Sequence, residues 1–281
     1  MSAPEASELA CVPLAHGGLY FPDLGWVAPG ALCAALLETV GLSVQARQVT
    51  QLEPDGHGWR LLDEQQRELD TFDAVVLANG NAVSQFSQAA TLPLKPLRGQ
   101  LSDLDQSCLQ SPLRLPLCAE GYVAPVTAGR FSFGASYRPG DLTLSTSDSE
   151  HEENLQRLHE QFPGLTQTGL TAADCNGRAG LRCTTPDRLP LVGPLPEISS
   201  FSERFTLLAK NAQASIAATG SYHPNLFVST GYGSRGLAYI PICTAWLVSQ
   251  LLQEPPTVSR SMAVNLHPAR FLIRDLIRGR T

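Results

Sequence analysis

A glycine-rich turn near the C-terminus carries the clearest chemical signal in the sequence. Its six residues, Gly231–Gly236, follow an apolar strand pattern at Leu226–Thr230 and precede an apolar helical pattern at Leu237–Leu252. This order of strand, glycine turn and helix is typical of dinucleotide sites, because backbone N–H groups and the helix dipole there attract negative charge. The pattern predicts a helix N-terminus that faces a ligand. Tight packing of the helix on a sheet is the alternative.

The position of this turn argues against the start of a standard dinucleotide-binding domain. Such a start is followed by an acidic residue about twenty positions on, at the end of a second strand. Here Glu254 is followed by Pro255 and Pro256. We therefore expect Gly231–Gly236 to face a ligand without opening a βαβ unit of its own.

Two arginines lie in surroundings that suit ligand binding. Arg182 sits among small and apolar residues, where a guanidinium can hold a carboxylate with two hydrogen bonds. The alternative is a salt bridge to Asp187 or another acid. Arg98 precedes Gly99 and Gln100, and this glycine would let the backbone approach a flat ligand while the arginine supplies charge. An ordinary strand edge is the alternative, and the residues alone favour it.

Two further segments could form the walls of a site. Asn79 and Gly80 end the apolar run 72–78, and α/β sheets bind ligands at the carboxyl ends of their strands. A plain turn is the alternative there. Tyr122 and Tyr137 are candidates for pocket walls, although isolated tyrosines are more often half-buried packing residues.

The last twenty residues form a basic tail. Arg270, Arg274 and Arg278 are spaced four apart, so a helix would place them in one stripe. Contact with phosphates is one interpretation of such a stripe, and a solvated helical face is the other.

Composition limits the remaining classes. The 281 residues carry a net charge of −6 with 43% hydrophobic residues, enough for a large core but unsuited to binding nucleic acid over the whole surface. Seven cysteines without a C-x-x-C pair suggest neither a zinc site nor a disulfide framework, and favour a reducing cytoplasm. No apolar stretch is long enough to span a membrane, the six histidines lack metal-ligand spacing, and no G-x-S-x-G motif indicates a hydrolase.

Strand and helix patterns interleave along the chain, which predicts an α/β or α+β fold of one mixed architecture. Strands are expected at 15–21, 43–48, 59–63, 72–78, 97–101 and 226–230, and helices at 29–39, 149–161 and 237–252. An antiparallel pair is expected at 121–125 and 130–136, a capping box at Ser149, and a loop or short strand at 186–196.

Several of these segments together resemble one family. They are Gly18–Pro22, Gly25–Pro29, Val75–Gly80, Pro96–Gln100, Gly134–Tyr137, Gly180–Gly193, Gly231–Leu237 and the basic end from Asn265 to Arg280. Their order and spacing resemble the FAD-dependent C-terminal module of the bifunctional tRNA 5-methylaminomethyl-2-thiouridine biosynthesis proteins, within the D-amino-acid oxidase/glycine oxidase group. The resemblance covers nearly the whole chain from about Leu14.

The resemblance implies a D-amino-acid-oxidase-like fold. A partial FAD-binding Rossmann-type domain, at about 27–95 and 186–260, would interleave with a mixed or antiparallel-sheet substrate domain at about 10–26 and 96–185, followed by a basic tail at 261–281. The strand and Gly-x-Gly-x-x-Gly turn that begin the family's FAD domain do not precede Leu14. We therefore expect an N-terminally truncated module that is normally fused to an S-adenosylmethionine-dependent methyltransferase module.

The resemblance also implies an activity in the cytoplasm. FAD would drive oxidative removal of the carboxymethyl group from 5-carboxymethylaminomethyl-uridine at the tRNA wobble position, giving the aminomethyl nucleoside and glyoxylate. The alternatives are an inactive remnant that keeps a tRNA or partner surface, and a small-amine oxidase like glycine oxidase.

The same resemblance assigns roles to residues. Arg182 and Tyr122 would be catalytic, with Arg182 also holding the substrate carboxylate beside Tyr137, and Arg270, Arg274 and Arg278 would contact tRNA. For the cofactor it implies Gly233, Ser234, Arg235 and Gly236 at the pyrimidine end of the flavin, Arg98, Gly99 and Gln100 beside the rings, Val49, Ala78, Asn79 and Gly80 near the adenosine and diphosphate, and Gly193. No metal is implied.

Overall fold

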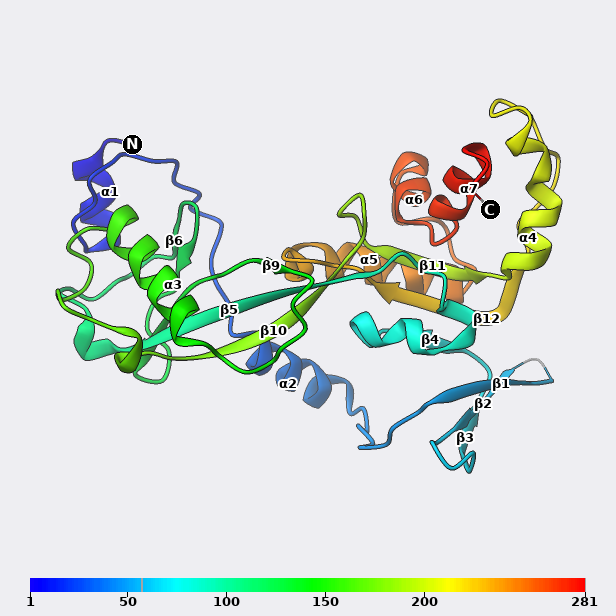
Figure 1. Cartoon of the computed structure of the whole chain (residues 1–281), viewed down its shortest axis with the longest axis horizontal. Coiled ribbons are helices and arrows are strands. Elements are labelled where there is room, and N and C mark those ends of the chain that lie inside the picture. The colour runs from blue at the N-terminus through cyan, green and yellow to red at the C-terminus, as the bar shows by residue number, and fades with distance from the viewer. Residues whose placement is uncertain (57, 281) are drawn as a thin grey trace. The chain divides into compact units, whose positions relative to one another are not determined.

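Each of two compact units is built from two separate stretches of the chain. In the computed structural model, which describes residues 1–56 and 58–280 (Figure 1), the first unit comprises Met1–Gln45 and Arg98–Leu181. The second comprises Ala46–Leu97 and the chain from Arg182 onward. The chain passes between the units within two long strands, β5 (Lys95–Asp105) and β10 (Asn176–Thr184). Residues 27–45, which we expected in the cofactor domain, instead fall in the first unit.

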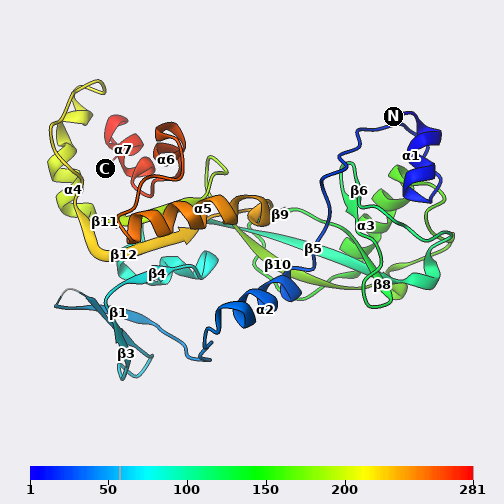
Figure 2. The ribbon, with the colours of Figure 1, turned by 180° about the vertical axis from the view of Figure 1, so that it is seen from behind.

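The sheet of the second unit holds the strand that precedes the glycine turn. Its order is β11 (Leu191–Pro196), β12 (Tyr222–Thr230) and β4 (Val75–Leu77), with β12 antiparallel to β11 and parallel to β4. Helix α5 (Gly236–Leu251) runs along this sheet, as Figure 2 shows, and packs on β11 and β12. The apolar strand and helix patterns on both sides of the turn therefore become neighbouring layers of one core.

The other elements of the second unit surround that sheet. A separate antiparallel sheet has the order β1 (Gln51–Asp55), β2 (Gly58–Leu62) and β3 (Glu68–Phe72). The remaining helices are α4 (Ile198–Phe205), α6 (Arg260–Leu266) and α7 (Arg270–Ile277), with short 3-10 turns η1 (Gly80–Gln85), η2 (Ser87–Ala89) and η5 (Thr206–Ala209). Helix α7 packs on α4, on η5 and on α6, so the expected basic tail is an integral part of this unit.

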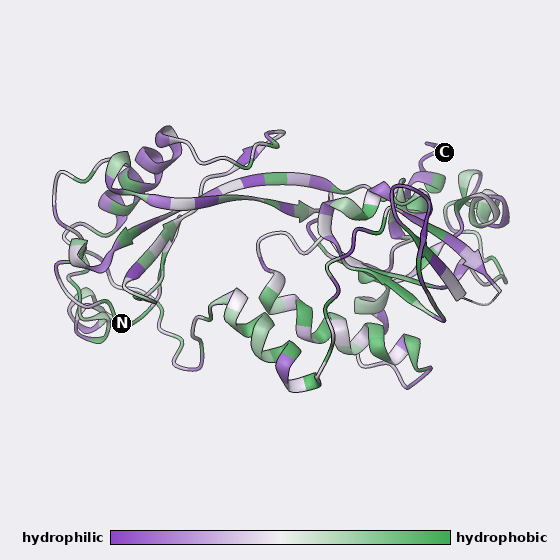
Figure 3. Ribbon diagram, turned by 90° about the horizontal axis from the view of Figure 1, so that it is seen from below, coloured by the Kyte–Doolittle hydropathy of each residue, from purple (hydrophilic) through white to green (hydrophobic). Residues whose placement is uncertain are grey.

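The first unit is a larger sheet covered by a helix. Its strand order is β10, β5, β8 (Arg130–Gly134), β7 (Tyr122–Val123) and β6 (Leu117–Cys118), and β9 (Arg138–Pro139) also pairs with β5. Helix α3 (Asp148–Gln161) packs on β8, and the core between them includes Leu104, Phe131, Phe133, Leu158 and Leu165. Two other helices, α1 (Ala3–Ala10) and α2 (Pro29–Val40), and the turns η3 (Gln106–Cys108) and η4 (Ala172–Asp174) complete it. Although α2 is strongly hydrophobic, as its mostly green ribbon in Figure 3 shows, none of its residues is buried.

Several predicted elements appear where the sequence placed them. The helices expected at 29–39 and 237–252 are α2 and α5, and the basic stripe is helical as α7. The expected antiparallel pair is confirmed by the register of Tyr122 with Gly134 and Val123 with Phe133. Among the described residues, no helix is both long and apolar enough to cross a membrane.

Three expected strands are wrong in position or extent. The segment 15–21 forms no strand, and the strand expected at 43–48 lies instead at Gln51–Asp55, where it pairs with β2. The apolar run 72–78 is divided by a bend, so Phe72 ends β3 and only Val75–Leu77 forms β4. The middle residue of β4, Val76, is 38% exposed, so this strand is not buried on both faces.

The start of α3 also differs from the prediction. The helix is preceded by Ser147 rather than Ser149, and the Ser147 hydroxyl donates to Glu150 at 3.1 Å. The cap lies two residues earlier because Glu150 turns inward, where it meets a buried arginine described below.

Candidate functional site

The carboxyl ends of two parallel strands bring two predicted ligand segments together in the second unit. Strand β4 leads into Asn79 and Gly80, and its parallel neighbour β12 leads into the glycine turn. The Thr230 hydroxyl at the end of β12 donates to the Gly80 carbonyl at 3.0 Å. This edge of the sheet is where doubly wound folds bind ligands, so the structure supports a site here.

The backbone of the turn requires glycine at two positions. Gly231 and Gly233 have φ values of +79° and +58°, in the left-handed region that side chains disfavour. A Cβ on Gly231 would lie 2.8 Å from the Cγ2 atom of Thr185, and the Gly233 N–H donates to the Cys183 carbonyl at 2.7 Å. The turn is thus fixed against the end of β10 and the loop that follows it.

The side chains of the turn divide between the core and the surface. Tyr232 points inward, where its hydroxyl lies 2.7 Å from the Ser229 hydroxyl and burial raises its pKa to about 12. Ser234 and Arg235 are exposed, and α5 begins at Gly236. A helix of 16 residues therefore starts directly behind an exposed turn, and its dipole favours negative charge at that end.

The loop between β10 and β11 is organised by one carboxylate. Asp187 accepts from Arg270 at 2.8 and 2.9 Å, from the Thr185 hydroxyl at 3.1 Å and from the Leu189 N–H at 3.2 Å. Burial by itself would raise the pKa of Asp187, but these hydrogen bonds outweigh it and lower the pKa to about 2. Asp187 therefore stays ionised and holds the loop that contacts the glycine turn.

Arg270 does not belong to an exposed basic stripe, and this part of the prediction is wrong. Its side chain is 7% exposed, and besides Asp187 it donates to the carbonyls of Leu189 at 2.7 Å and Pro190 at 3.1 Å. Arg274 is 39% exposed and lies 3.4 Å from Asp187, and Arg278 is exposed. Only the outer two arginines of the stripe can reach a phosphate.

Arg98 is also buried, and protein groups surround its guanidinium. Its side chain is 2% exposed, forms an ion pair with Glu150 and donates to the carbonyls of Thr143 and Ser145, each at 2.7 Å. Gln100 is equally occupied, since its side chain donates to the Ser147 carbonyl at 2.9 Å and accepts from the Ser147 N–H at 2.8 Å. Strand β5, which holds both residues, lies between β10 and β8 in the sheet.

The remaining predicted residues lie as follows. Arg182 is a half-buried residue of β10. Asp187, the salt-bridge partner considered for it as an alternative, forms ion pairs with Arg270 and Arg274. In the first unit, Tyr122 on β7 and Tyr137 before β9 are exposed. Of the other cofactor candidates, Val49 is half-buried, Ala78 and Asn79 are exposed, and Gly99 is buried within β5.

Gly193 faces protein and not the open edge of the sheet. A Cβ at this position would meet the side chain of Gln250 at 3.2 Å and Pro268 at 3.4 Å. Its φ of +135° adds a second reason for glycine. The close approach that glycine permits at this position is thus an approach to α5 and to the segment after α6.

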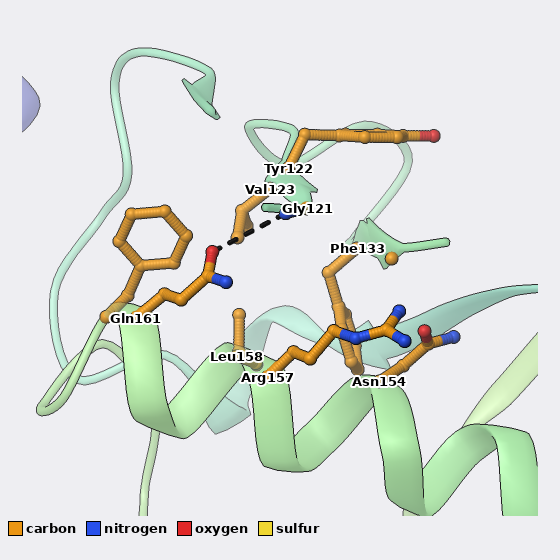
Figure 4. A pocket seen from close by; sticks show the side chains of 10 residues that line it. Gly121, Tyr122, Val123, Phe133, Asn154, Arg157, Leu158 and Gln161 are labelled. Atoms are coloured by element: carbon orange, nitrogen blue, oxygen red, sulfur yellow. Dashed lines mark hydrogen bonds between the residues drawn. The ribbon is translucent and has the colours of Figure 1, made fainter. Parts of the chain in front are cut away.

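A small hollow in the first unit was not predicted from the sequence. It lies between α3 and strands β7 and β8, with Tyr122 at its rim (Figure 4). Gln161 accepts from the Glu120 N–H at 3.1 Å, and Arg157 donates to the Ala135 carbonyl at 3.2 Å. These contacts tie α3 to the segments beside β7 and β8. The sequence feature that could have indicated this hollow is the row of polar residues on α3.

Comparison with known proteins identifies the family. A sequence model described as "FAD dependent oxidoreductase" matches residues 1–251. The chain belongs to this family. It is 38% identical over 285 residues to the tRNA 5-methylaminomethyl-2-thiouridine biosynthesis bifunctional protein MnmC of Pseudomonas syringae pv. syringae, and 39% identical over 281 residues to the protein of that name from Stutzerimonas stutzeri. These alignments cover 100% and 98% of this chain but 43% and 42% of the relatives. The chain thus spans less than half the length of these curated relatives.

Solved structures confirm the expected fold. Glycine oxidase from Geobacillus kaustophilus superposes with a TM-score of 0.71 at 20% identity, over 96% of this chain and 66% of that protein. Glycine oxidase from Bacillus cereus gives 0.67 at 16% identity, over 92% and 66%. The D-amino-acid-oxidase-like fold inferred from the sequence is therefore correct.

The family's cofactor, FAD, fits the edge formed by β4 and β12. A Cβ on Gly80 would meet no atom within 4 Å, so the backbone there is open to a ligand. The turn before α5 adds exposed residues and a helix N-terminus, which suit a group that becomes more negative on reduction. The residues at this edge agree with the cofactor of the family.

Proposed function

We propose that the chain oxidises a secondary amine that carries a carboxymethyl group, namely the 5-carboxymethylaminomethyl arm of a wobble uridine in tRNA. The similarity to MnmC proteins over the whole chain carries this proposal. The bifunctional name of those relatives, and the 43% of their length that is matched, support a fused methyltransferase module in the whole protein.

In this reaction FAD would supply the two-electron oxidation of the bond between the amine nitrogen and the carbon that bears the carboxylate. Water then adds to the resulting substrate imine, and cleavage of the carbon–nitrogen bond yields glyoxylate and the aminomethyl nucleoside. The chain's own part is to position the substrate and to stabilise charge.

Two groups would position the substrate and the cofactor. Arg182 would bind the substrate carboxylate through two hydrogen bonds, since a guanidinium matches a carboxylate in shape and charge. Gly233–Gly236, together with Ala78–Gly80, would hold FAD at the edge of β4 and β12. The N-terminus of α5 would stabilise the negative charge of the reduced state there.

The test is release of glyoxylate from tRNA that carries the carboxymethylaminomethyl group. Arg182→Ala should raise KM by about 100-fold, the effect expected on loss of a charged bidentate contact. Arg178→Ala is the matched control, because Arg178 is exposed and lies four residues earlier on the same strand. An unchanged KM in Arg182→Ala would remove the carboxylate role from this residue.

The tail supports a nucleic-acid substrate over a free amino acid. Arg274 and Arg278 are the members of the stripe that reach solvent, and a small substrate needs no such surface. An inactive remnant with a tRNA surface would bind tRNA and release no glyoxylate. A small-amine oxidase would act on a free carboxymethylamine and ignore tRNA.

A further inference from the structure

The loop at 185–190 lies between the C-terminal helix and the glycine turn. On one side, the methyl group of Thr185 packs so closely on Gly231 that a Cβ there would lie 2.8 Å away, and the Cys183 carbonyl just before the loop accepts from Gly233. On the other side, Arg270 at the start of α7 binds Asp187 within the loop. The loop therefore joins two elements that are separated along the chain.

Arg270 uses its whole guanidinium in this contact. Nε and Nη2 bind the two carboxylate oxygens of Asp187, Nη2 also donates to the Leu189 carbonyl, and Nη1 donates to the Pro190 carbonyl. The group also lies over the Phe271 ring at 4.5 Å from its centre. A planar fork with fixed donor directions can satisfy all these acceptors together, whereas a lysine ammonium cannot.

Thr185 transmits this arrangement to the turn. Its hydroxyl donates to Asp187 at 3.1 Å and to the Leu189 carbonyl at 2.7 Å, which fixes the orientation of the side chain. The hydroxyl thus faces the loop held by Arg270, while the methyl group faces Gly231. Movement of the loop would displace the atom against which the turn is packed.

We propose that Arg270 is a positioning residue: through Asp187 and Thr185 it holds the Gly231–Gly236 turn in its ligand-binding shape. The inference rests on the proposed function only for the identity of the ligand. The C-terminal helix then has two roles along one stripe of arginines. Its buried arginine sets the geometry of the cofactor turn, and its outer arginines remain available to a phosphate-bearing partner.

The test is hydrogen exchange of the turn amides in the full chain. Arg270→Lys should speed exchange at Gly233 by about tenfold, as expected when a charged hydrogen-bond network is lost. Exchange at Val228, in the centre of the sheet, should change far less. In the same variant FAD should bind about tenfold more weakly, measured by flavin fluorescence.

A milder variant keeps the test decisive if Arg270→Lys fails to fold. Thr185→Ser removes the methyl group that faces Gly231 and keeps the hydroxyl that binds Asp187. It should speed exchange at Gly233 about threefold, a change typical of a lost methyl contact.

The control is Leu52→Ala, a core truncation in the β1–β3 sheet of the same unit. If this control speeds exchange at Gly233 as much as Arg270→Lys does, the effect is global and the proposal is overturned. Unchanged exchange in Arg270→Lys and Thr185→Ser would also overturn it. Failure of the wild-type chain to bind FAD would instead refute the proposed function, because the exchange result does not depend on the cofactor.

Discussion

Each unit of the molecule buries one arginine–carboxylate pair, and the two pairs differ in how far they are closed off from solvent. In the first unit the side chains of Arg98 and Glu150 are 2% and 6% exposed. In the second, those of Arg270 and Asp187 are 7% and 21% exposed, and Asp187 also meets the half-exposed Arg274. The first pair also meets half-exposed charges, because Asp141 lies 3.6 Å from Arg98 and Arg138 lies 4.0 Å from Glu150. The two pairs therefore differ in the carboxylate, which is sealed in the first pair and partly open to solvent in the second.

The two pairs also differ in what they hold in place: the first stabilises its own unit, and the second also contacts the loop beside the candidate site. Arg98 and Glu150 tie β5 to α3 and to the loop at 143–145. Arg270 and Asp187 tie α7 to the loop that supports the glycine turn. A buried arginine near a predicted site therefore needs its partners identified before a role is assigned to it.

The largest effect should come from breaking the sealed pair. Arg98→Ala leaves the buried Glu150 with only Arg138, 4.0 Å away, as a cation, and the free energy of unfolding should fall by about 3–5 kcal/mol. Urea unfolding measures it. Replacing both partners, as in Arg98→Met with Glu150→Leu, should recover most of the loss, because no uncompensated charge remains. A small loss in the single variant would show that water reaches Glu150.

A smaller loss is expected from the open pair. Arg270→Ala leaves Asp187 beside Arg274 and partly in solvent, so the loss in unfolding free energy should be about 2 kcal/mol. The same urea experiment compares the two arginines directly. If Arg270→Ala lowered the free energy of unfolding as much as Arg98→Ala does, the difference in exposure between the two pairs would not set the size of the loss.

Acid should weaken the second unit at a higher pH than the first. Burial and the charge of Arg270 lower the pKa of His267 from 6.5 to about 4, so the unfolded chain takes up this proton first and stability falls between those values. Asp187 extends the loss from about pH 4 to about pH 2. In the first unit, burial would raise the pKa of Glu150, but hydrogen bonds from Ser136 and Arg98 lower it. The stability that Glu150 contributes is therefore lost only as the pH falls below its ordinary pKa of 4.5.

Amide exchange in each unit as a function of pH checks this order. His267→Gln should remove the step between pH 6.5 and pH 4 and leave the first unit unchanged. Simultaneous loss of protection in both units would contradict the assignment to His267.

The smallest effect on stability should come from the outer arginines. Arg274→Gln and Arg278→Gln should each change unfolding free energy by less than about 1 kcal/mol, because exposed ion pairs contribute little. Each should still reduce the slope of log affinity for tRNA against log salt concentration by about one unit, the change expected on loss of one phosphate contact. Filter binding at several salt concentrations measures the slope, and an unchanged slope in both variants would remove the tail from the tRNA surface.

Local patterns in the sequence predicted local structure well. The strand, turn and helix around Gly231–Gly236 are continuous in the chain, so apolar spacing and glycine positions were sufficient to find them. The strand expected at 43–48 was misplaced because alternation continues weakly through 43–48, and pairing with β2 selects Gln51–Asp55.

Long-range pairing was not visible in the same way. Arg98 and Glu150 are 52 residues apart, and Arg270 and Asp187 are 83 apart. Spacing on one helix made Arg270 look like a surface residue, and only the folded chain brings Asp187 to it. The close neighbours of Gly193, Gln250 and Pro268, are also distant in sequence, so spacing along the chain could not indicate them.

The central claim is that the Gly231–Gly236 turn binds FAD at the edge of β4 and β12. Titration of the purified chain with FAD, followed by flavin absorbance and fluorescence, tests it most directly, with Gly233→Val as the comparison. The account predicts that the wild-type chain perturbs the flavin bands and that Gly233→Val binds at least tenfold more weakly, because a β-branched residue is strained at a φ of +58°. A wild-type chain that takes up no FAD, or a Gly233→Val variant that binds it equally well, would contradict the claim.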